Sequence, residues 1–250
     1  MMKLEDLQDK HKGKIGFAVG SGPSLRKQDV SKLADYVTIS VNSSIPKVQF
    51  ADYFLADDIG VSHWNYYRDL LPNLYATCLL FRGKLHNKAY HLNKEKIIWF
   101  NHKTWYCPED KSYHPEGLVF TKEADKPIIG ARTSLASAIH FLYIMGCDPI
   151  VLLGCDCCYE GKRRYYWQFP GEIKCVRNTG EPVFSTPNKG MIKGRPVDSH
   201  SVDFLKYWKA LAEQADKQGI KIIDASNGLL ECFERMDYEE VFEKFGDRRK

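Results

Sequence analysis

Short apolar runs alternate along this chain with segments that carry helix caps or helical periodicity. Such runs, rich in β-branched and aromatic residues and bounded by turn residues, are typical of buried strands. Clear examples are residues 15–19, 37–41, 53–56 and 150–153, and weaker ones are residues 97–100 and 118–120. Because the clear runs are almost wholly apolar, we predict a sheet that is covered on both faces, as parallel sheets are.

Helix signals fall between these runs. Thr133 or Ser134 can cap a nearly all-apolar helix over residues 135–145, which ends at Gly146. A second helix is predicted over residues 202–218, followed by a strand over 220–223, and a polar terminal helix over 236–245. Residues 28–34 are expected to form a short helix or turn.

This alternation predicts an α/β fold of Rossmann-like type with a mostly parallel sheet and helices on both faces. The length of 250 residues suits one domain that spans 1–250. Residues 159–198 break the pattern, because they are rich in Arg, Lys, Tyr, Gly and Pro and have no sustained period. Long irregular segments are usually functional or disordered, so we expect a mobile lid here.

Composition argues against several classes of protein, including nucleic-acid-binding and membrane-spanning proteins. The formal charge of +4, without a basic arm, gives no support for nucleic-acid binding. The longest apolar stretch, near residues 139–145, is too short for a transmembrane segment, and the polar start is no signal peptide. Eight cysteines without an export signal indicate reduced thiols. We expect a cytoplasmic protein, and neither peripheral contact with the inner face of a membrane nor a homo-oligomer conflicts with the sequence.

Three motifs fall where a predicted strand gives way to a helix. They are Gly20-Ser21-Gly22-Pro23-Ser24-Leu25, Gly154-Cys155-Asp156 and His200-Ser201. Ligands of open α/β sheets bind outside the carboxyl ends of the strands, so the motifs indicate an enzyme that handles a phosphorylated or nucleotide donor. Backbone amides of the glycine turn could approach an anion, although a plain tight turn would use the same residues.

Each remaining polar candidate has a functional and a structural interpretation. Asn42 and Ser43 could bind a base, ribose or phosphate, or could cap a turn. Asp57 and Asp58 could hold a divalent cation or form a solvated turn. The cluster Cys155, Cys157 and Cys158 lacks the paired spacing of structural zinc sites, which favours buried thiols.

His200 is the candidate general base, because a neutral imidazole can accept the proton of an attacking hydroxyl. Asp156 could orient His200 or bind a sugar hydroxyl. Alternatively, Asp198 and the neighbouring serines cap the helix and His200 faces solvent. In the lid, Arg163 and its neighbours could neutralise phosphate, and Tyr165 or Tyr166 could hydrogen-bond a leaving phosphate.

The strand-end motifs resemble those of the bacterial sialyltransferases of lipooligosaccharide synthesis. The resemblance covers the glycine turn, Asn42, the Thr133-Ser134 helix start, Gly154-Cys155-Asp156 and His200-Ser201. It implies a GT-A-like variant of the predicted fold, in which Gly20, Ser21, Gly22, Asn42, Thr133 and Ser134 contact a CMP-linked donor. Further candidates for substrate binding are Ser24, Ser43, Asp58, Tyr159 and Arg163. The resemblance also implies that His200 is the base, that no metal is needed, and that Tyr159, Tyr165 or Tyr166 binds the departing phosphate.

A second resemblance is to the MptE-like proteins, which include 6-hydroxymethylpterin diphosphokinases and flagellin glycosylation factors. It rests on the same glycine turn, on Asp52-Tyr53 leading to Asp57-Asp58, and on the ending Asp224-Ala225-Ser226-Asn227-Gly228. A diphosphokinase would use ATP and Mg²⁺, with Asp57, Asp58 or Asp156 near the metal.

The sequence therefore favours a glycosyltransferase that moves a sugar, such as a sialic acid, from a nucleotide-sugar donor to a glycan or small-molecule hydroxyl, without a cofactor. The alternatives are pyrophosphoryl transfer from ATP to a pterin-type alcohol, with Mg²⁺, and a non-catalytic nucleotide-binding protein.

Overall fold

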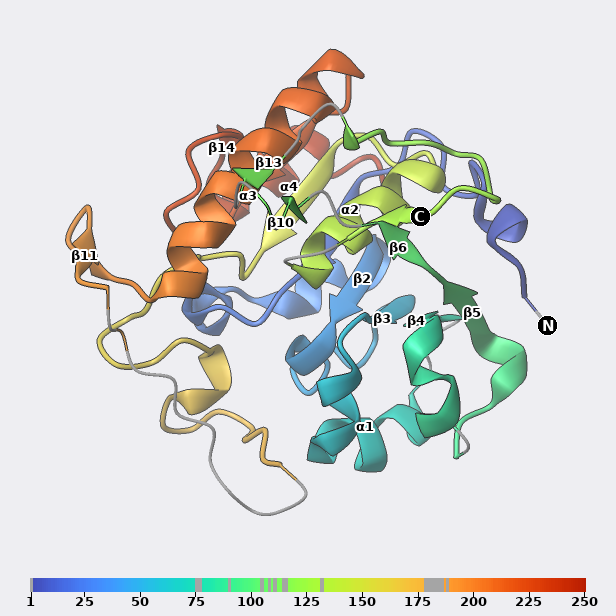
Figure 1. Ribbon diagram of the computed structural model, residues 1–250, viewed down its shortest axis with the longest axis horizontal. Helices are drawn as coiled ribbons and strands as arrows, with labels where there is room; N and C mark the ends of the chain where they lie inside the picture. Colours follow the sequence, from blue (N-terminus) through green and yellow to red (C-terminus); the bar gives the residue numbers. More distant parts are fainter. Residues whose placement is uncertain are drawn as a thin grey trace.

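The computed structural model describes residues 2–74, 78–89, 91–103, 106–107, 109, 112–113, 117–130, 133–177, 187 and 189–250. At its centre lies a sheet with the strand order β14-β13-β10-β1-β2-β3-β4-β5, in which each pair of neighbours is parallel (Figure 1). The strands are β1 Gly16–Val19, β2 Val37–Val41, β3 Tyr53–Ala56, β4 Cys78–Arg82, β5 Ile97–Phe100, β10 Ile150–Leu153, β13 Ile222–Asp224 and β14 Glu234–Arg235.

Helices cover both faces of this sheet. They are α1 Asn65–Asp69, α2 Ser134–Ile144, α3 Ser199–Lys217 and α4 Tyr238–Phe245. Three short strand pairs lie outside the sheet: β6 His102–Lys103 with β9 Ile128–Ile129, β7 Tyr106–Cys107 with β8 Ser112–Tyr113, and β11 Met191–Ile192 with β12 Arg195–Pro196. The α/β class and the mostly parallel sheet expected from the sequence are confirmed.

Alternation along the strands divides the interior into two apolar cores. Successive side chains of a strand point to opposite faces, so Ala18 joins one core and its neighbour Phe17 joins the other. The core that contains Ala18 is closed by α2 and α3, and the core that contains Phe17 is closed by α1 and α4. Burial on both faces explains why these strands are continuous apolar runs rather than alternating ones.

Most predicted elements are found close to their predicted bounds. β2, β3, β5 and β10 match the predicted runs residue for residue. The predicted strand over 118–120 is wrong, because these residues are irregular, and β4 was missed. Helix α3 begins at Ser199 rather than 202, because the side chain of Asp198 accepts a hydrogen bond from the Ser201 amide and caps the helix.

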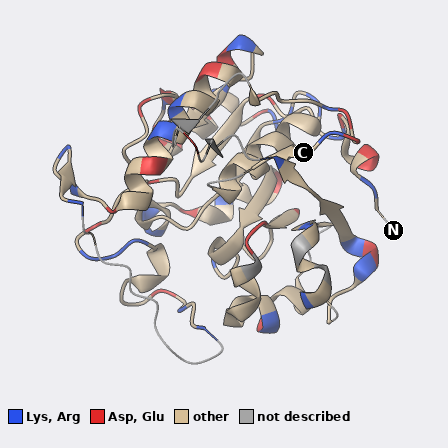
Figure 2. Ribbon diagram, in the orientation of Figure 1, with Lys and Arg blue, Asp and Glu red and all other residues tan. Residues whose placement is uncertain are grey.

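The segment 159–198 is anchored over its described first half. Trp167 is buried and its indole Nε1–H donates to Ser43 Oγ at 3.2 Å, while the amide of Tyr166 donates to the carbonyl of Ser21 at 3.0 Å. Lys and Arg recur along this outer loop (Figure 2). Residues 178–186 and 188 of the predicted lid lie outside the described residues. No helix in the described part of the chain has the length and apolar character needed to cross a bilayer.

Candidate functional site

A cavity of about 1100 Å³ opens at the carboxyl edge of the sheet. β1 and β10 are neighbours, and from this pair the chain winds outward in opposite directions, through β2 to β5 on one side and through β13 on the other. Such a switch point leaves a crevice at the strand ends, which is where open α/β sheets bind ligands. Residues that follow β1, β2, β3 and β10 line the cavity, together with the first residues of α2 and α3.

The glycine turn after β1 uses most of its amides to hold its own shape. The amide of Gly20 donates to the Leu153 carbonyl at 2.7 Å, and the amide of Gly22 donates to the Gly154 carbonyl at 2.8 Å. The amide of Ser24 donates to the carboxylate of Asp156 at 3.2 Å. Within the described residues, the amide of Ser21 has no hydrogen-bond partner. The turn therefore offers an anion one amide rather than the cradle of several that the sequence suggested.

Glycine is required at position 22 by close packing. A Cβ atom there would lie 1.9 Å from Oδ2 of Asp156 and 2.8 Å from the Gly154 carbonyl oxygen. The backbone itself is unstrained, with φ −63° and ψ 165°. The glycine thus permits contact between the two strand ends, β1 and β10, rather than an unusual turn.

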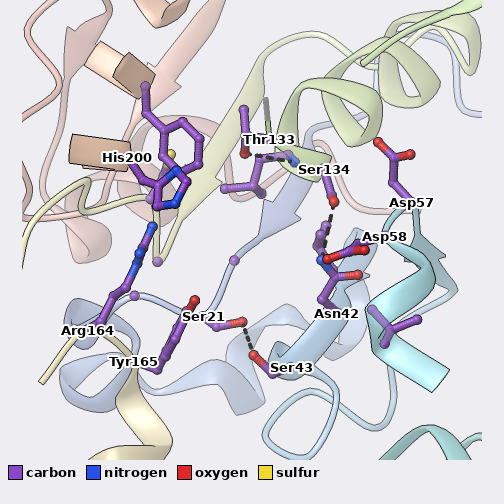
Figure 3. Close-up of a pocket in the computed structure, with 18 of the residues that line it drawn as sticks. Ser21, Asn42, Ser43, Asp57, Asp58, Thr133, Ser134, Arg164, Tyr165 and His200 are labelled. Carbon is purple, nitrogen blue, oxygen red and sulfur yellow. Dashed lines mark hydrogen bonds between the residues drawn. The ribbon is translucent and has the colours of Figure 1, made fainter. Parts of the chain in front are cut away.

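Asn42 follows β2 directly and lies in the left-handed region, with φ 50°, which asparagine tolerates better than most residues. Its Nδ2 donates to Ser134 Oγ at 3.2 Å (Figure 3). Its buried Oδ1 has no partner among the described residues. Because Asn42 lines the cavity, this oxygen is a candidate acceptor for a ligand N–H or O–H.

Hydroxyl groups surround the same part of the cavity. Ser43 Oγ donates to Ser21 Oγ at 2.9 Å, which joins the turns after β2 and β1 (Figure 3). Thr133 Oγ1 caps α2 by accepting from the amide of Leu135 at 3.3 Å. The donor-site residues expected from the sequence therefore do line one cavity, with the exception of Ser24, which faces a second cavity of about 800 Å³.

Asp156 does not orient His200. Its carboxylate is buried and accepts hydrogen bonds from the amide and the hydroxyl of Ser24, the latter at 2.8 Å. Burial raises the pKa of Asp156 to about 6, although the two Ser24 hydrogen bonds act against this rise. Asp156 thus connects the end of β10 to the turn after β1.

His200 lies in the first turn of α3 and lines the cavity. Its side chain is exposed, and its ring contacts that of Phe204, with 6.2 Å between the ring centroids. The cap of this helix is Asp198, which also accepts from Tyr159 Oη and Arg164 at 2.8 Å each. Burial alone would raise the pKa of Asp198, but these groups and Ser201 hold it below its ordinary value.

The lid residues are divided between cavity and core. Tyr165 lines the cavity and stacks on Trp167, with 5.2 Å between ring centroids, whereas Tyr166 is buried in the core. Tyr159 is buried and bonded to Asp198, and Arg163 is exposed and covers the ring of Phe169. Tyr166, Tyr159 and Arg163 therefore do not reach the cavity as expected; Tyr165 does, and Arg164 lines it in place of Arg163.

The structure adds three residues that sequence reasoning did not combine. Asp57 is buried at the end of β3, and His102 Nδ1 lies 2.9 Å from its Oδ1. Arg82, the last residue of β4, approaches the same oxygen at 3.5 Å. All three line the cavity. Recognition of β4 would have placed Arg82 at the carboxyl edge, whereas no sequence signal singled out His102.

The acidic residues after β3 do not fit a ready-made metal site. The carboxylate of Asp57 is shared by His102 and Arg82, and Asp58 Oδ1 caps the next turn by accepting from the Gly60 amide at 2.9 Å. Among the described residues, no three His, Cys, Asp or Glu side chains are grouped so that they could hold a metal ion. The seven cysteines whose side chains are described are free thiols.

Comparison with known proteins places this site in context. The MAf glycosyltransferase from Magnetospirillum magneticum AMB-1 is similar in fold, with a TM-score of 0.52 and 12% identity over 94% of this chain. The chain spans only 37% of that protein. The sialyltransferase CstII from Campylobacter jejuni, in complex with cytidine-5'-monophosphate, gives a TM-score of 0.48 and 17% identity over 90% of this chain and 85% of that one. No curated protein matches the sequence.

A comparison with families of sequences shows which family the chain belongs to. The profile of the 6-hydroxymethylpterin diphosphokinase MptE-like family matches residues 1–162, which include β1 to β10, the glycine turn, Asp57, His102 and Asp156. This is more than half of the chain, and the chain belongs to the MptE-like family.

Proposed function

We propose that this protein is a transferase that binds a nucleotide donor in the switch-point cavity and moves a group from it to an acceptor hydroxyl. The observation that carries the proposal is the common lining of one cavity by the turns after β1, β2 and β10 and by the first turn of α3. A volume of about 1100 Å³ can hold a nucleotide together with an acceptor.

The group transferred is a sugar under this proposal, and a CMP-linked sialic acid is the donor that we test first. Ser21, with its unpartnered amide, and Asn42, with its unpartnered Oδ1, are the proposed contacts of the nucleotide. Arg164 and Tyr165 line the cavity on the side of His200 (Figure 3) and are the proposed contacts of the transferred sugar and its carboxylate, because charge-assisted and phenolic hydrogen bonds bind an anion.

His200 is the proposed general base. It takes the proton of the acceptor hydroxyl, whose oxygen forms a bond to the anomeric carbon. The bond between that carbon and the phosphate oxygen breaks, and its electron pair leaves with the nucleotide. The exposure of His200 suits this task, because a glycan acceptor must reach the base from solvent.

A thermal-shift panel tests donor binding. CMP, CMP-sialic acid, UDP, GDP and ATP are each added with Mg²⁺ and with EDTA. A ligand that binds only the folded state adds about 2.7 kcal/mol of stability at one hundred times its dissociation constant. We expect cytidine nucleotides to raise the melting temperature with or without the metal. If no nucleotide raises it, the proposal is wrong.

The variant His200→Gln tests the base. Turnover of the donor found in the panel should fall on the order of a hundredfold, with unchanged nucleotide binding. The matched control is His91→Gln, because His91 is outside the cavity lining and bonds to the Tyr67 carbonyl. Turnover that is equal in both variants would contradict a role for His200.

Family membership favours a second candidate, pyrophosphoryl transfer from ATP to a pterin-type alcohol. In that case ATP should stabilise the protein only with Mg²⁺, and AMP should be released when 6-hydroxymethylpterin is present. Tight binding of a nucleotide that stays intact over long incubations with varied acceptors would instead support a non-catalytic binding protein.

A further inference from the structure

Besides His200, the cavity lining includes His63 and His102, and His102 is held in place by a carboxylate. His102 Nδ1 lies 2.9 Å from one carboxylate oxygen of Asp57 and 3.0 Å from the other. Both side chains are 7% exposed. Arg82 Nη1 lies 3.5 Å from Oδ1 of Asp57, and the hydroxyl of Ser137 on α2 lies 3.5 Å from Oδ2. A histidine whose one ring nitrogen is bonded to a carboxylate has a defined orientation.

The backbone around the ring is closely fitted to it. Strand β6 presents His102 opposite Ile128 of β9, and Gly130 follows two residues later. A Cβ atom at Gly130 would lie 2.5 Å from His102 Nδ1 and 2.7 Å from its Cβ and Cγ, so the side chain of His102 packs directly against this glycine. The Gly130 carbonyl is fixed in turn by the hydroxyl of Tyr207 on α3, at 3.0 Å. The site is therefore built from the strand end, α2 and α3 together.

The second ring nitrogen is left for a ligand. Within the described residues, His102 Nε2 makes no hydrogen bond, and it is not among the buried polar atoms without a partner. His102 lines the cavity, and Nε2 is the ring nitrogen that remains for a hydrogen bond to a bound molecule. Burial of an Asp–His pair costs desolvation energy, and packing alone does not account for this cost. Proton transfer between His102 and a ligand is a function that would account for it.

His102 and His200 differ in depth. His200 is exposed at the start of α3, where an acceptor can enter and leave. Asp57, the partner of His102, lies on the opposite side of the cavity from His200 (Figure 3). The wall around Asp57 also contains Arg82, which is half-buried and whose cation can attract a phosphate. Depth and charge therefore assign this wall to the donor.

We propose that His102, positioned by Asp57, is the general acid of the transfer. This proposal rests on the function proposed above. His200 accepts the acceptor hydroxyl proton, and His102 gives the proton on Nε2 to the phosphate oxygen that leaves. One bond forms at the acceptor oxygen, one bond to the phosphate oxygen breaks, and the proton count stays balanced. The same role serves a CMP-linked sugar and a pyrophosphoryl transfer from ATP, since the first releases CMP and the second releases AMP.

Histidine-ring NMR tests the contact without requiring activity. Ring resonances of ¹⁵N-labelled protein are followed during titration with CMP and, separately, with AMP. The His102 signals are assigned by their loss in His102→Gln. We expect them to move with the nucleotide that stabilises the protein, while those of His91 stay in place. Binding without movement of the His102 signals overturns this proposal alone, and absence of binding by every nucleotide overturns both proposals.

Kinetics test the proton transfer. In His102→Gln, release of CMP from CMP-sialic acid, or of AMP from ATP, should fall on the order of a hundredfold. The decline of turnover at high pH, where a general acid loses its proton, should disappear. A loss that is equal at all pH values means that His102 only binds, and overturns the assignment.

Asp57→Asn tests positioning. This variant should keep nucleotide binding, lose turnover about tenfold, and move the high-pH decline, because the ring loses its carboxylate partner. An unchanged pH profile would make Asp57 structural and would contradict the pair. Among the described residues, the other ionisable groups on this wall are Asp58, His63 and Tyr66 after β3, and Arg82 on β4. His63→Gln in parallel shows whether the decline belongs to the neighbouring histidine, which would also overturn the assignment.

Discussion

Asp57 and Asp156 occupy equivalent places on the two sides of the switch point. Each follows a buried parallel strand, each is at most 5% exposed, and each lines the same cavity. Their partners differ. Asp156 accepts two hydrogen bonds from Ser24 and so fixes a turn, whereas Asp57 holds the ring of His102 beside Arg82. Position in the fold brings an aspartate to the site, and the partner decides what it can do there.

The largest loss of stability is expected when a steric clash separates Asp156 from the turn after β1. In Gly22→Ala the new methyl group would lie 1.9 Å from Asp156 Oδ2 and 2.8 Å from a backbone oxygen that cannot move aside easily. We expect a loss of about 3 kcal/mol or more in the free energy of unfolding, measured by urea denaturation. Gly83→Ala is the control, because its nearest neighbour is the end of the Asn101 side chain at 3.2 Å. Equal stability of the two variants would show that the two strand ends can separate freely.

The next effect on stability comes from the buried charge of the Asp156 carboxylate. Burial raises the pKa of Asp156 from an ordinary 3.8 to about 6. The ionised carboxylate therefore opposes folding: its cost is absent below about pH 4, grows as pH rises, and is complete above about pH 6. At about 1.4 kcal/mol per pKa unit, Asp156→Asn should gain up to about 3 kcal/mol over the wild type between pH 4 and pH 7.5.

Urea unfolding at several pH values measures this difference. Asp247→Asn, a change at an exposed aspartate, controls for the altered net charge. If wild type and Asp156→Asn show parallel pH dependence, desolvation of Asp156 is not the dominant influence on its carboxylate.

The same two aspartates show how far the sequence could lead. The strand ends were predictable because a buried parallel strand is a local, continuous apolar run, and β3 and β10 match their predicted bounds. The partners were not predictable, because they come from distant segments. Asp57 and His102 are 45 residues apart in sequence, and Asp156 and Ser24 are 132 apart.

Other differences have the same origin. Tyr165 and Tyr166 are neighbours with equal sequence signals, yet only Tyr165 faces the cavity, because the turn that starts at Tyr166 buries its ring. His102 stands alone in the sequence and becomes a candidate only when β3 and β6 bring it to Asp57. Local pattern fixes where a cavity forms, whereas long-range packing selects the side chains that enter it.

The smallest expected loss of stability gives the clearest test of whether Asp156 and Asp57 have different roles. Ser24→Ala removes the hydroxyl that donates to Asp156 Oδ2 at 2.8 Å and leaves the amide hydrogen bond in place. The loss of one buried hydrogen bond to a carboxylate should cost about 1–2 kcal/mol of unfolding free energy. Ser31→Ala is the matched control, because Ser31 Oγ donates to Asp29 at an exposed site, where we expect less than about 0.5 kcal/mol. If Asp156 serves the turn, turnover should change little, whereas a large loss of turnover with unchanged stability would give Asp156 the chemical role that we assign to the Asp57 side.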